Sequence, residues 1–363
     1  MPSFRTGIVV RLLEGRPGLV RVEVDLGGGP ERAYGLTQLT GPVAVGDRVV
    51  VNTTAVELGL GTGGWHVIHW NLAREAWSER GPGHVMKARY TSLQADVGSA
   101  EEHAAALAEV ESVDGMPVVV AGLHSQMAAV AAAFKAAVSQ QGRPDARLAY
   151  VMTDGAGLPI ALSDLVAALR ERALVDVTIT CGHAFGGDHE AVSLFSALAV
   201  ARHLAGADAT VVVMGPGVVG TGTRLGFSAL EVGPALDAAA ALGGVPVACL
   251  RASFADPRPR HRGLSHHSAT ALRLACRSRV ILPLPLVGGE EESRLRADLA
   301  AAGLDSRHDV VGVAPGDILG LFAAHGLEVQ SMGRPAAADP VLFACGAAAG
   351  IVAAGRLYDG LGG

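Results

Sequence analysis

Six apolar runs of strand length constrain the fold of this chain more than any other feature of its sequence. Each run is followed by a few loop residues and then by an Ala-rich stretch with helical spacing. Strands that are apolar on both faces and alternate with helices are typical of a parallel sheet covered by helices on both sides. The pattern therefore predicts a doubly wound α/β domain with a mostly parallel sheet over residues 113–363. The runs are "MPVVVAG", "RLAYVM", "VDVTITC", "ATVVVM", "VPVACL" and "RVILPL".

The first 75 residues show a different pattern of apolar residues. In "LVRVEVDL" the apolar side chains of Val20, Val22 and Val24 alternate with charged ones, which is the period of a strand with one buried face. "RTGIVVRLL" and "GDRVVVNTTAVEL" repeat the alternation, and Gly- and Pro-containing turns separate the three segments. We expect a small N-terminal antiparallel β-barrel or sandwich over residues 1–75. Residues 76–112, with the polar stretch "GPGHVMKARYTSLQ", are interpreted as a linker or lid, and a strand with polar alternation is the alternative.

Charge and hydropathy argue against two classes of partner. The formal net charge is -6 and there is no Lys/Arg-rich tract, so the phosphate contacts that dominate nucleic-acid affinity are missing. The apolar stretch "VLFACGAAAGIVAAG" is shorter than the roughly 20 residues that span a bilayer, so we expect a buried helix and no membrane association. Its Gly346 and Gly350 have the spacing that lets two helices approach closely, either within the fold or across a homo-oligomer interface.

The four cysteines lie far apart, mostly within apolar runs, and none belongs to a CxxC pair. Such cysteines behave as small buried side chains in a reducing compartment. The N-terminal residues also lack the charged and apolar regions of a signal peptide. We therefore expect a cytoplasmic protein whose partner is a small-molecule anion.

Polar residues cluster where the predicted strands end. Ligands of parallel sheets bind beyond the carboxyl ends of the strands, where loops and helix N-termini converge. His124 follows the first run and Asp154 the second, and we expect both to be ligand-binding residues. Most histidines of the α/β region fall at such positions, whereas His203 and His325 are expected on helix faces.

The stretch "CGHAFGGDHEAV" follows the third run. We expect Asp188 to cap a helix that begins with "HEAV", which would bring His183, Asp188 and His189 toward one ion. Imidazole nitrogens and a carboxylate suit a divalent transition metal such as Zn²⁺, Mn²⁺ or Fe²⁺, and His183 and Asp188 are also candidate catalytic residues. In the alternative interpretation, Asp188 is an ordinary helix cap and the histidines bond loop backbone.

The fourth run leads into "MGPGVVGTGTRLGFS". Gly215, Gly217, Gly220 and Gly222 could turn backbone N–H groups toward an anion, and a purely conformational turn is the alternative. The match to a dinucleotide fingerprint is poor, because the loop does not enter a helix at once and no acidic residue ends the next strand.

A second polar loop, "RPRHRGLSHHSAT", follows the fifth run. Its arginines could hold a phosphate or carboxylate, and we assign that role to Arg262. His266 and His267 are the candidate general acid or base, because the pKa of imidazole lies near neutrality. A solvated surface loop is the alternative interpretation.

Taken in order behind "NTTAVELGLGTGG", the segments "GPGHVMKARYTSLQ", "GHAFGGDHEAV", "GPGVVGTGTRLGFS" and "GLSHHSAT" resemble an uncharacterised bacterial family that is catalogued only as a domain of unknown function. The resemblance covers nearly the whole chain and implies no activity, cofactor or catalytic residue.

Three functions follow from the residues themselves. The first is an enzyme that acts on a small anionic or phosphorylated metabolite, with metal-assisted hydrolysis as the reaction class to test first. The second is a non-catalytic sensor module that binds a nucleotide or metabolite. The third is a structural protein whose oligomer uses the C-terminal glycine-rich helix, in which case a bulky residue at Gly350 would dissociate the assembly.

Overall fold

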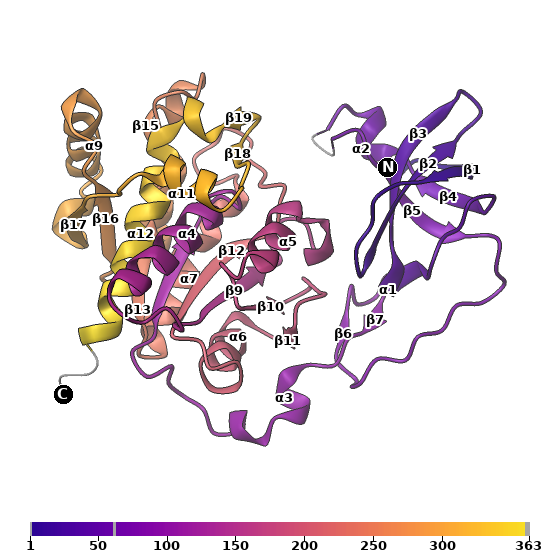
Figure 1. The fold of residues 1–363 in the computed structure, drawn as a ribbon, viewed down its shortest axis with the longest axis horizontal. Coiled ribbons are helices and arrows are strands. Elements are labelled where there is room, and N and C mark those ends of the chain that lie inside the picture. Colours follow the sequence, from indigo (N-terminus) through magenta and orange to yellow (C-terminus); the bar gives the residue numbers. More distant parts are fainter. Residues whose placement is uncertain (1, 61–62, 360–363) are drawn as a thin grey trace. The chain divides into compact units, whose positions relative to one another are not determined.

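The chain forms two compact units, residues 1–98 and residues 99–363 (Figure 1). The structure is a computed structural model that describes residues 2–60 and 63–359. Each unit has its own hydrophobic core.

The first unit contains a closed five-stranded barrel with the strand order β1-β2-β3-β5-β4. Neighbouring strands are antiparallel except for β3 and β5, which pair in parallel. Val22 and Val24 lie fully buried inside, as the alternation predicts, while Asp25 is exposed. The predicted β-barrel is therefore confirmed. Its strands are β1 (Phe4–Leu12), β2 (Leu19–Asp25), β3 (Pro30–Leu36), β4 (Arg48–Asn52) and β5 (His66–Asn71), with the short helices α1 (Thr37–Thr40) and α2 (Thr54–Glu57) between them.

A small hairpin follows the barrel and belongs to the same unit. Its strands are β6 (Met86–Lys87) and β7 (Ala95–Asp96), and the second unit begins just before helix α3 (Ala100–His103). The "GPGHVMKARYTSLQ" segment thus lies largely in this hairpin.

The second unit is built on an eight-stranded sheet, and every strand pair in it is parallel. The strand order is β11-β10-β9-β12-β8-β13-β16-β17. The six apolar runs form the six inner strands, which confirms the prediction of a parallel α/β sheet. The two edge strands, β11 (His189–Ala191) and β17 (Asp309–Val313), were not predicted. The inner strands are β8 (Pro117–Ala121), β9 (Leu148–Thr153), β10 (Val177–Cys181), β12 (Ala209–Met214), β13 (Val245–Cys249) and β16 (Ile281–Pro285).

Helices cover both faces of this sheet, as a doubly wound fold requires. One face packs against α4 (Gln126–Gln140), α5 (Asp164–Glu171), α11 (Ile318–Ala324) and α12 (Pro340–Asp359). The other packs against α6 (Leu194–Ala199), α7 (Val232–Ala241), α9 (Gly289–Ala301), α10 (Leu304–Arg307) and the turn that continues α8 (His266–Thr270).

Helix α12 contains the glycine-rich segment and is a core helix of the second unit. It lies beside α4, and a Cβ atom on Gly350 would be 2.3 Å from the carbonyl oxygen of Val130. Residues 340–357 are long and apolar enough to cross a membrane, yet 72% of that stretch is buried within the fold. The glycines therefore serve close helix packing inside the unit, and Gly350 is not available to an oligomer interface.

Strand β8 marks the place where a ligand site is expected. It leads to α4 on one face of the sheet, whereas its neighbours β12 and β13 lead to α7 and α8 on the other. Crevices open at the carboxyl ends of strands where the winding switches faces in this way. Residues 215–228 and 250–265 are the loops that flank this point.

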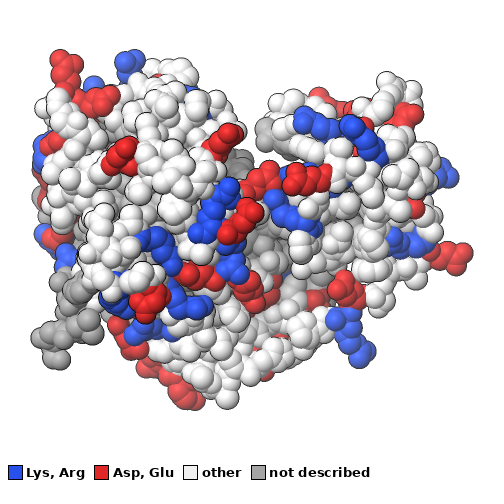
Figure 2. Space-filling model, in the orientation of Figure 1, with Lys and Arg blue, Asp and Glu red and all other residues white. Residues whose placement is uncertain are grey.

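Acidic and basic side chains are interspersed over the face of the molecule that Figure 2 shows. Neither sign forms a continuous field there. That face thus matches the mixed charges of the sequence.

Candidate functional site

Three histidines meet beyond the carboxyl end of β13. We call His261, His266 and His267 the histidine cluster. One ring nitrogen from each lies within 4.8 Å of the other two. The ring centroids are 4.4 to 5.0 Å apart. Among the residues that the structure describes, no other set of three His, Cys, Asp or Glu side chains comes as close.

The local fold brings these histidines together by a hairpin and a helix cap. Strands β14 (Ala252–Ser253) and β15 (Gly263–Leu264) pair in antiparallel fashion and return the chain toward β13. Ser265 then caps α8 by accepting a hydrogen bond from the backbone N–H of His267, which fixes His266 and His267 in the first turn. The same Ser265 hydroxyl lies 2.7 Å from His261 Nδ1, so one side chain contacts both the ring of His261 and the backbone of His267.

Arg251 fixes the protonation pattern of His267. Its Nη1 donates a hydrogen bond of 3.0 Å to His267 Nδ1. Because a guanidinium has only donors, Nδ1 must accept, and the proton of the neutral ring is then on Nε2. The ring of His267 also stacks on Phe227, with centroids 3.9 Å apart and planes within 4°. His267 is therefore an oriented hydrogen-bond donor.

A network of charged side chains, in which Asp256 and Asp339 are buried, lies next to Arg251. Asp256 accepts two hydrogen bonds from the Arg258 guanidinium, 2.9 and 2.7 Å long, and its Oδ2 is 3.9 Å from Arg251. The Arg258 guanidinium holds the pKa of Asp256 well below its usual range. Asp339, at the start of α12, accepts hydrogen bonds from Ser253 and from Arg334, which reaches Asp256 at 3.5 Å. The network links β13 to the hairpin β18 (Gln330–Ser331) and β19 (Arg334–Pro335) and to α12.

The histidines are neutral in this environment. Burial, followed by the charge of Arg251, lowers the pKa of His261 and of His267 to about 3. Burial and then Arg260 lower the pKa of His266. Burial lowers the pKa of Arg251 to about 10, so that this guanidinium stays charged at pH 7. The site therefore combines uncharged imidazoles with fixed positive charge.

His266 differs from its two neighbours in one respect. Its Nε2 atom is buried and has no hydrogen-bond partner. More than nine-tenths of buried polar groups in proteins are paired, so this atom marks a place for a ligand or a water molecule.

The glycine loop that follows β12 lies against this cluster. A Cβ atom on Gly220 would be 3.5 Å from His267 Nε2, and one on Gly222 would be 3.6 Å from the Arg260 guanidinium carbon. Gly215 packs tightly on the loop after β9, where a Cβ atom would be 2.2 Å from the carbonyl oxygen of Gly157. Gly217 has a φ of 98° and no neighbour that a Cβ would touch. The loop thus contributes Gly220 and Gly222 to the site, and Gly215 serves packing.

The comparison with known protein families covers both units. Residues 32–350 match the family described as "Protein of unknown function (DUF3866)". The chain belongs to this family. A search of curated proteins finds no match. The histidine cluster and the glycine loop of this DUF3866 chain both lie within the matched residues.

The prediction that Asp188 caps a helix beginning at His189 is wrong. Residues His189–Ala191 form the edge strand β11, and α6 begins five residues later at Leu194, capped by Ser193. Asp188 instead accepts hydrogen bonds from the backbone N–H and the hydroxyl of Thr178, at 2.8 and 3.0 Å, and pairs with Arg170. An aspartate can satisfy backbone donors in several settings, and here it holds the edge strand.

This placement separates the predicted metal ligands His183, Asp188 and His189. His183 lies beyond the carboxyl end of β10, while Asp188 bonds Thr178 near its amino end. The strand rises about 3.3 Å per residue, which puts roughly 10 Å of β10 between Thr178 and Cys181. His189 pairs with Ile179 on the neighbouring strand. The three side chains therefore do not share an ion.

The other predicted residues lie at different places around the sheet edge. Both ring nitrogens of His124 are occupied, since Nδ1 donates to the carbonyl of Met214 and Nε2 accepts from the Ser163 hydroxyl. Asp154 accepts a hydrogen bond from the backbone of His183 at the end of β9, and two strands separate β9 from β13. Arg262 is exposed, and Arg260 rather than Arg262 lies beside His266 in a hollow. His124 is thus a structural residue in this DUF3866 chain.

Sequence reasoning did not identify the supporting residues Phe227, Asp339 and Arg224. Phe227 stacks on His267, and Asp339 is 86 residues from its partner Ser253. No local spacing signals contacts of this range. The only hint at Phe227 is its position at the end of the glycine loop.

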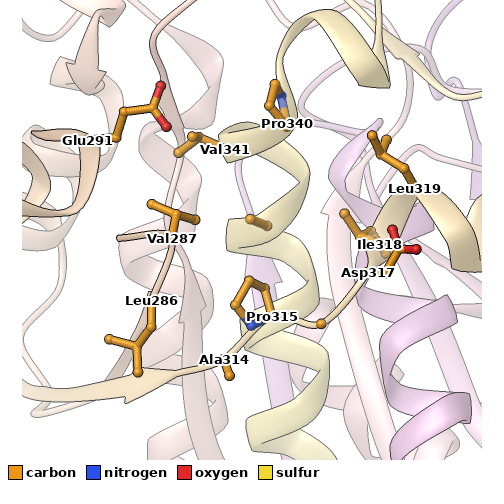
Figure 3. Close-up of a pocket in the computed structure, with 12 residues that line it drawn as sticks. Leu286, Val287, Glu291, Ala314, Pro315, Asp317, Ile318, Leu319, Pro340 and Val341 are labelled. Atoms are coloured by element: carbon orange, nitrogen blue, oxygen red, sulfur yellow. The ribbon is translucent and has the colours of Figure 1, made fainter. Parts of the chain in front are cut away.

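A second hollow lies apart from the histidines, beyond the carboxyl ends of β16 and β17. Its volume is about 530 Å³. Figure 3 shows Leu286, Val287 and Val341 lining it, with the carboxylates of Glu291 and Asp317 at its sides. Asp317 caps α11 through the backbone N–H of Gly320. This hollow is mostly apolar and has no histidine, so the histidine cluster is the better candidate for chemistry.

Proposed function

We propose that this chain is a cytoplasmic enzyme that hydrolyses a small anionic metabolite, with His266 as the general base that activates water. The observation that carries the proposal is the buried, unpartnered Nε2 atom of His266 beside the oriented donor His267. Its lowered pKa leaves the imidazole of His266 neutral at pH 7 and able to accept a proton. The buried free thiols of all four cysteines support a reducing compartment.

The roles follow from the contacts. Ser265 and Ser268 both accept hydrogen bonds from backbone N–H groups, so water is the nucleophile that we assign. His266 takes a proton from the attacking water and passes it to the leaving group. The Nε2–H of His267 and the charge of Arg251 stabilise the negative charge that develops on the substrate.

Metal-assisted hydrolysis is the second candidate, and the clustering of three neutral imidazoles favours it. Zn–N bonds of about 2.0–2.1 Å in a tetrahedron place nitrogens roughly 3.3 Å apart, so the rings would have to close in by up to about 1.5 Å. A metal could bind Nε2 of His267 only if the proton of Nε2 moved to Nδ1. Nδ1 could then no longer accept the hydrogen bond from Arg251. For these reasons the acid–base mechanism is placed first.

Hydrolysis of chromogenic phosphate and carboxylate esters tests the proposal on the full chain. The comparison is between the natural protein, His266→Gln and the control His325→Gln, because His325 directly follows α11 and is not part of the cluster. We expect His266→Gln to lower kcat at least about 100-fold and His325→Gln to leave it unchanged.

Each assay is run before and after treatment with EDTA. Activity that survives EDTA supports the acid–base mechanism. Activity that disappears and returns with Zn²⁺ or Mn²⁺, together with a metal-induced rise in Tm that His261→Gln abolishes, supports the metal mechanism instead. Activity that is the same in His266→Gln as in the natural protein would overturn both.

A further inference from the structure

A hollow of about 380 Å³ adjoins the histidine cluster on the side of His266. We call it the arginine pocket. Its volume falls within the range of small-molecule sites, which is about 300–1,000 Å³. The residues that line it are Gly222, Arg224, Arg260, His266, Ala269, Thr270, Arg273 and Ala302.

The lining of the arginine pocket is positively charged. Arg224, Arg260 and Arg273 come from three separate segments of the chain, and no acidic residue lines the hollow. None of the three guanidiniums forms an ion pair with a described residue. Nearby arginines behave differently, since Arg258 pairs with Asp256 and Arg294 with Asp298. Three guanidiniums that line one hollow without an ion pair to a described residue, in a protein of net charge -6, indicate an anionic ligand.

The segment that carries Arg224 is held by its own hydrogen bonds. The hydroxyls of Thr221 and Thr223 lie 3.0 Å apart, and Thr223 also accepts from the backbone N–H of Gly226. Thr221 N–H donates to the Gly226 carbonyl over 2.8 Å. Gly222 has a φ of 84°, which a residue with a side chain rarely adopts, and this turn brings the loop to the Arg260 guanidinium. Arg224 is thus presented at a defined position.

We infer that the arginine pocket binds a phosphoryl group of the substrate and places the bond to be hydrolysed next to His266. A phosphoryl dianion offers several acceptor oxygens in different directions, which suits donors from three sides better than a single planar carboxylate does. The inference deepens the proposed function and rests on it for the role of His266. Binding of the anion itself depends only on the pocket.

Titration of inorganic phosphate into the EDTA-treated full chain, followed by calorimetry, tests the inference. We expect Arg224→Gln, Arg260→Gln and Arg273→Gln each to weaken phosphate binding by about tenfold. Arg262→Gln is the matched control, because Arg262 is an exposed arginine of the same loop that does not line the pocket, and its affinity should not change. Thermal midpoints confirm that each variant is folded.

Three results would overturn the inference. They are the absence of phosphate binding by the natural protein, an equal loss of affinity in Arg262→Gln, and binding of acetate as tight as that of phosphate. His267→Gln separates this inference from the proposed function, because His267 does not line the arginine pocket. This variant should keep phosphate affinity within about twofold while hydrolysis is lowered. Phosphate binding without hydrolysis of any ester would refute the proposed hydrolase activity and support phosphate binding in the arginine pocket. Hydrolysis with a KM that none of the arginine variants changes would refute the pocket alone.

Discussion

Arg251 determines which ring nitrogen of His267 carries the proton, and it contributes to the pKa of that ring. It is buried, donates to His267 Nδ1 and is the largest charged influence on the pKa of that ring after burial. We predict that Arg251→Met raises the pKa of His267, because it removes a positive charge and a donor to Nδ1. The substitution should also lower the free energy of unfolding by about 1–3 kcal/mol, since a buried acceptor loses its partner.

NMR titration of the His267 ring measures the first effect and urea unfolding the second. Arg273→Met serves as the control, because that arginine is exposed and has no hydrogen bond to a histidine side chain among the described residues. A His267 titration that is the same in Arg251→Met as in the natural protein would show that the ring is not controlled by this guanidinium.

We expect protonation of His124 to make the stability of the second unit depend on pH. Burial lowers its pKa to about 4, against about 6.5 in the unfolded chain. Between these values the unfolded state binds the extra proton, so stability is full above pH 6.5 and falls as the pH drops toward 4. We predict a loss of roughly 1 kcal/mol from this residue between pH 7 and pH 5, because the ring is partly accessible and the full linkage effect is reduced.

Urea midpoints of the natural protein and of His124→Asn at pH 7 and pH 5 check this prediction. The variant should lose less stability between the two pH values, whatever its stability at pH 7. His325→Asn, on an accessible helix end, should behave like the natural protein. A pH dependence that His124→Asn does not reduce would refute the assignment.

At the level of single residues, the sequence predicted where His266 and His267 lie better than which residues they contact. The paired histidines His266 and His267 follow a strand end, and the general rule for parallel sheets was enough to select them. The partner of His267 and the arginines that line the arginine pocket depend on how the loop folds back, which the Arg-rich sequence of the loop does not show. Arg262 and Arg260 are two positions apart, yet only Arg260 faces the hollow.

At the level of elements, burial decides what a sequence pattern can reveal. The six inner strands are covered on both faces and therefore read as continuous apolar runs. The edge strand β11 has three residues, two of them polar and only partly buried, and carries no such signal. The role of Asp188 was predicted wrongly because a carboxylate can accept hydrogen bonds from different backbone N–H groups. The first turn of a helix offers such donors, and so does Thr178 in a strand.

Helix α12 offers a test of close packing with a matched control on the same helix. A Cβ atom at Gly350 would be 2.3 Å from the Val130 carbonyl oxygen, whereas nothing lies within 4 Å of one at Gly355. We predict that Gly350→Ala lowers the free energy of unfolding by about 1–3 kcal/mol through overpacking. Gly355→Ala should raise it by about 0.5–1 kcal/mol, because alanine is the better helix former.

Thermal and urea unfolding of the two variants measure this difference, and size-exclusion chromatography follows their association state. The packing account would fail if both substitutions had the same effect on stability. It would also fail if Gly350→Ala kept its stability and changed only its elution volume.

At the level of the whole molecule, the two units have separate cores and should unfold separately. We predict two transitions in urea, since nothing in either core is shared. Val24→Ala in the barrel and Val119→Ala in the large sheet, both fully buried, should each lower one transition by about 1–3 kcal/mol.

Tryptophan fluorescence follows the transition of the first unit, because all three tryptophans, Trp65, Trp70 and Trp77, lie in it. Far-UV circular dichroism follows the transition of the second unit, which contains the long helices. One coincident transition that both substitutions shift by equal amounts would show that the units unfold together.

The boundary between the two units could be predicted only in part from the sequence. The change from alternating to continuous apolar runs marks two kinds of sheet, but the short hairpin of β6 and β7 has too few residues for any pattern. The family match begins at residue 32 and ends at residue 350, so it includes residues of both units.

The position of α12 in the chain has a consequence for biosynthesis. This helix leaves the ribosome after every other described element, yet it packs on α4, the first long helix of its unit, and Asp339 at its start anchors the charges behind the histidines. During translation, the apolar faces of α4 and the sheet that α12 will cover stay open to solvent or to a chaperone. A nascent chain therefore completes the charge network beside the histidine cluster only after α12 has left the ribosome.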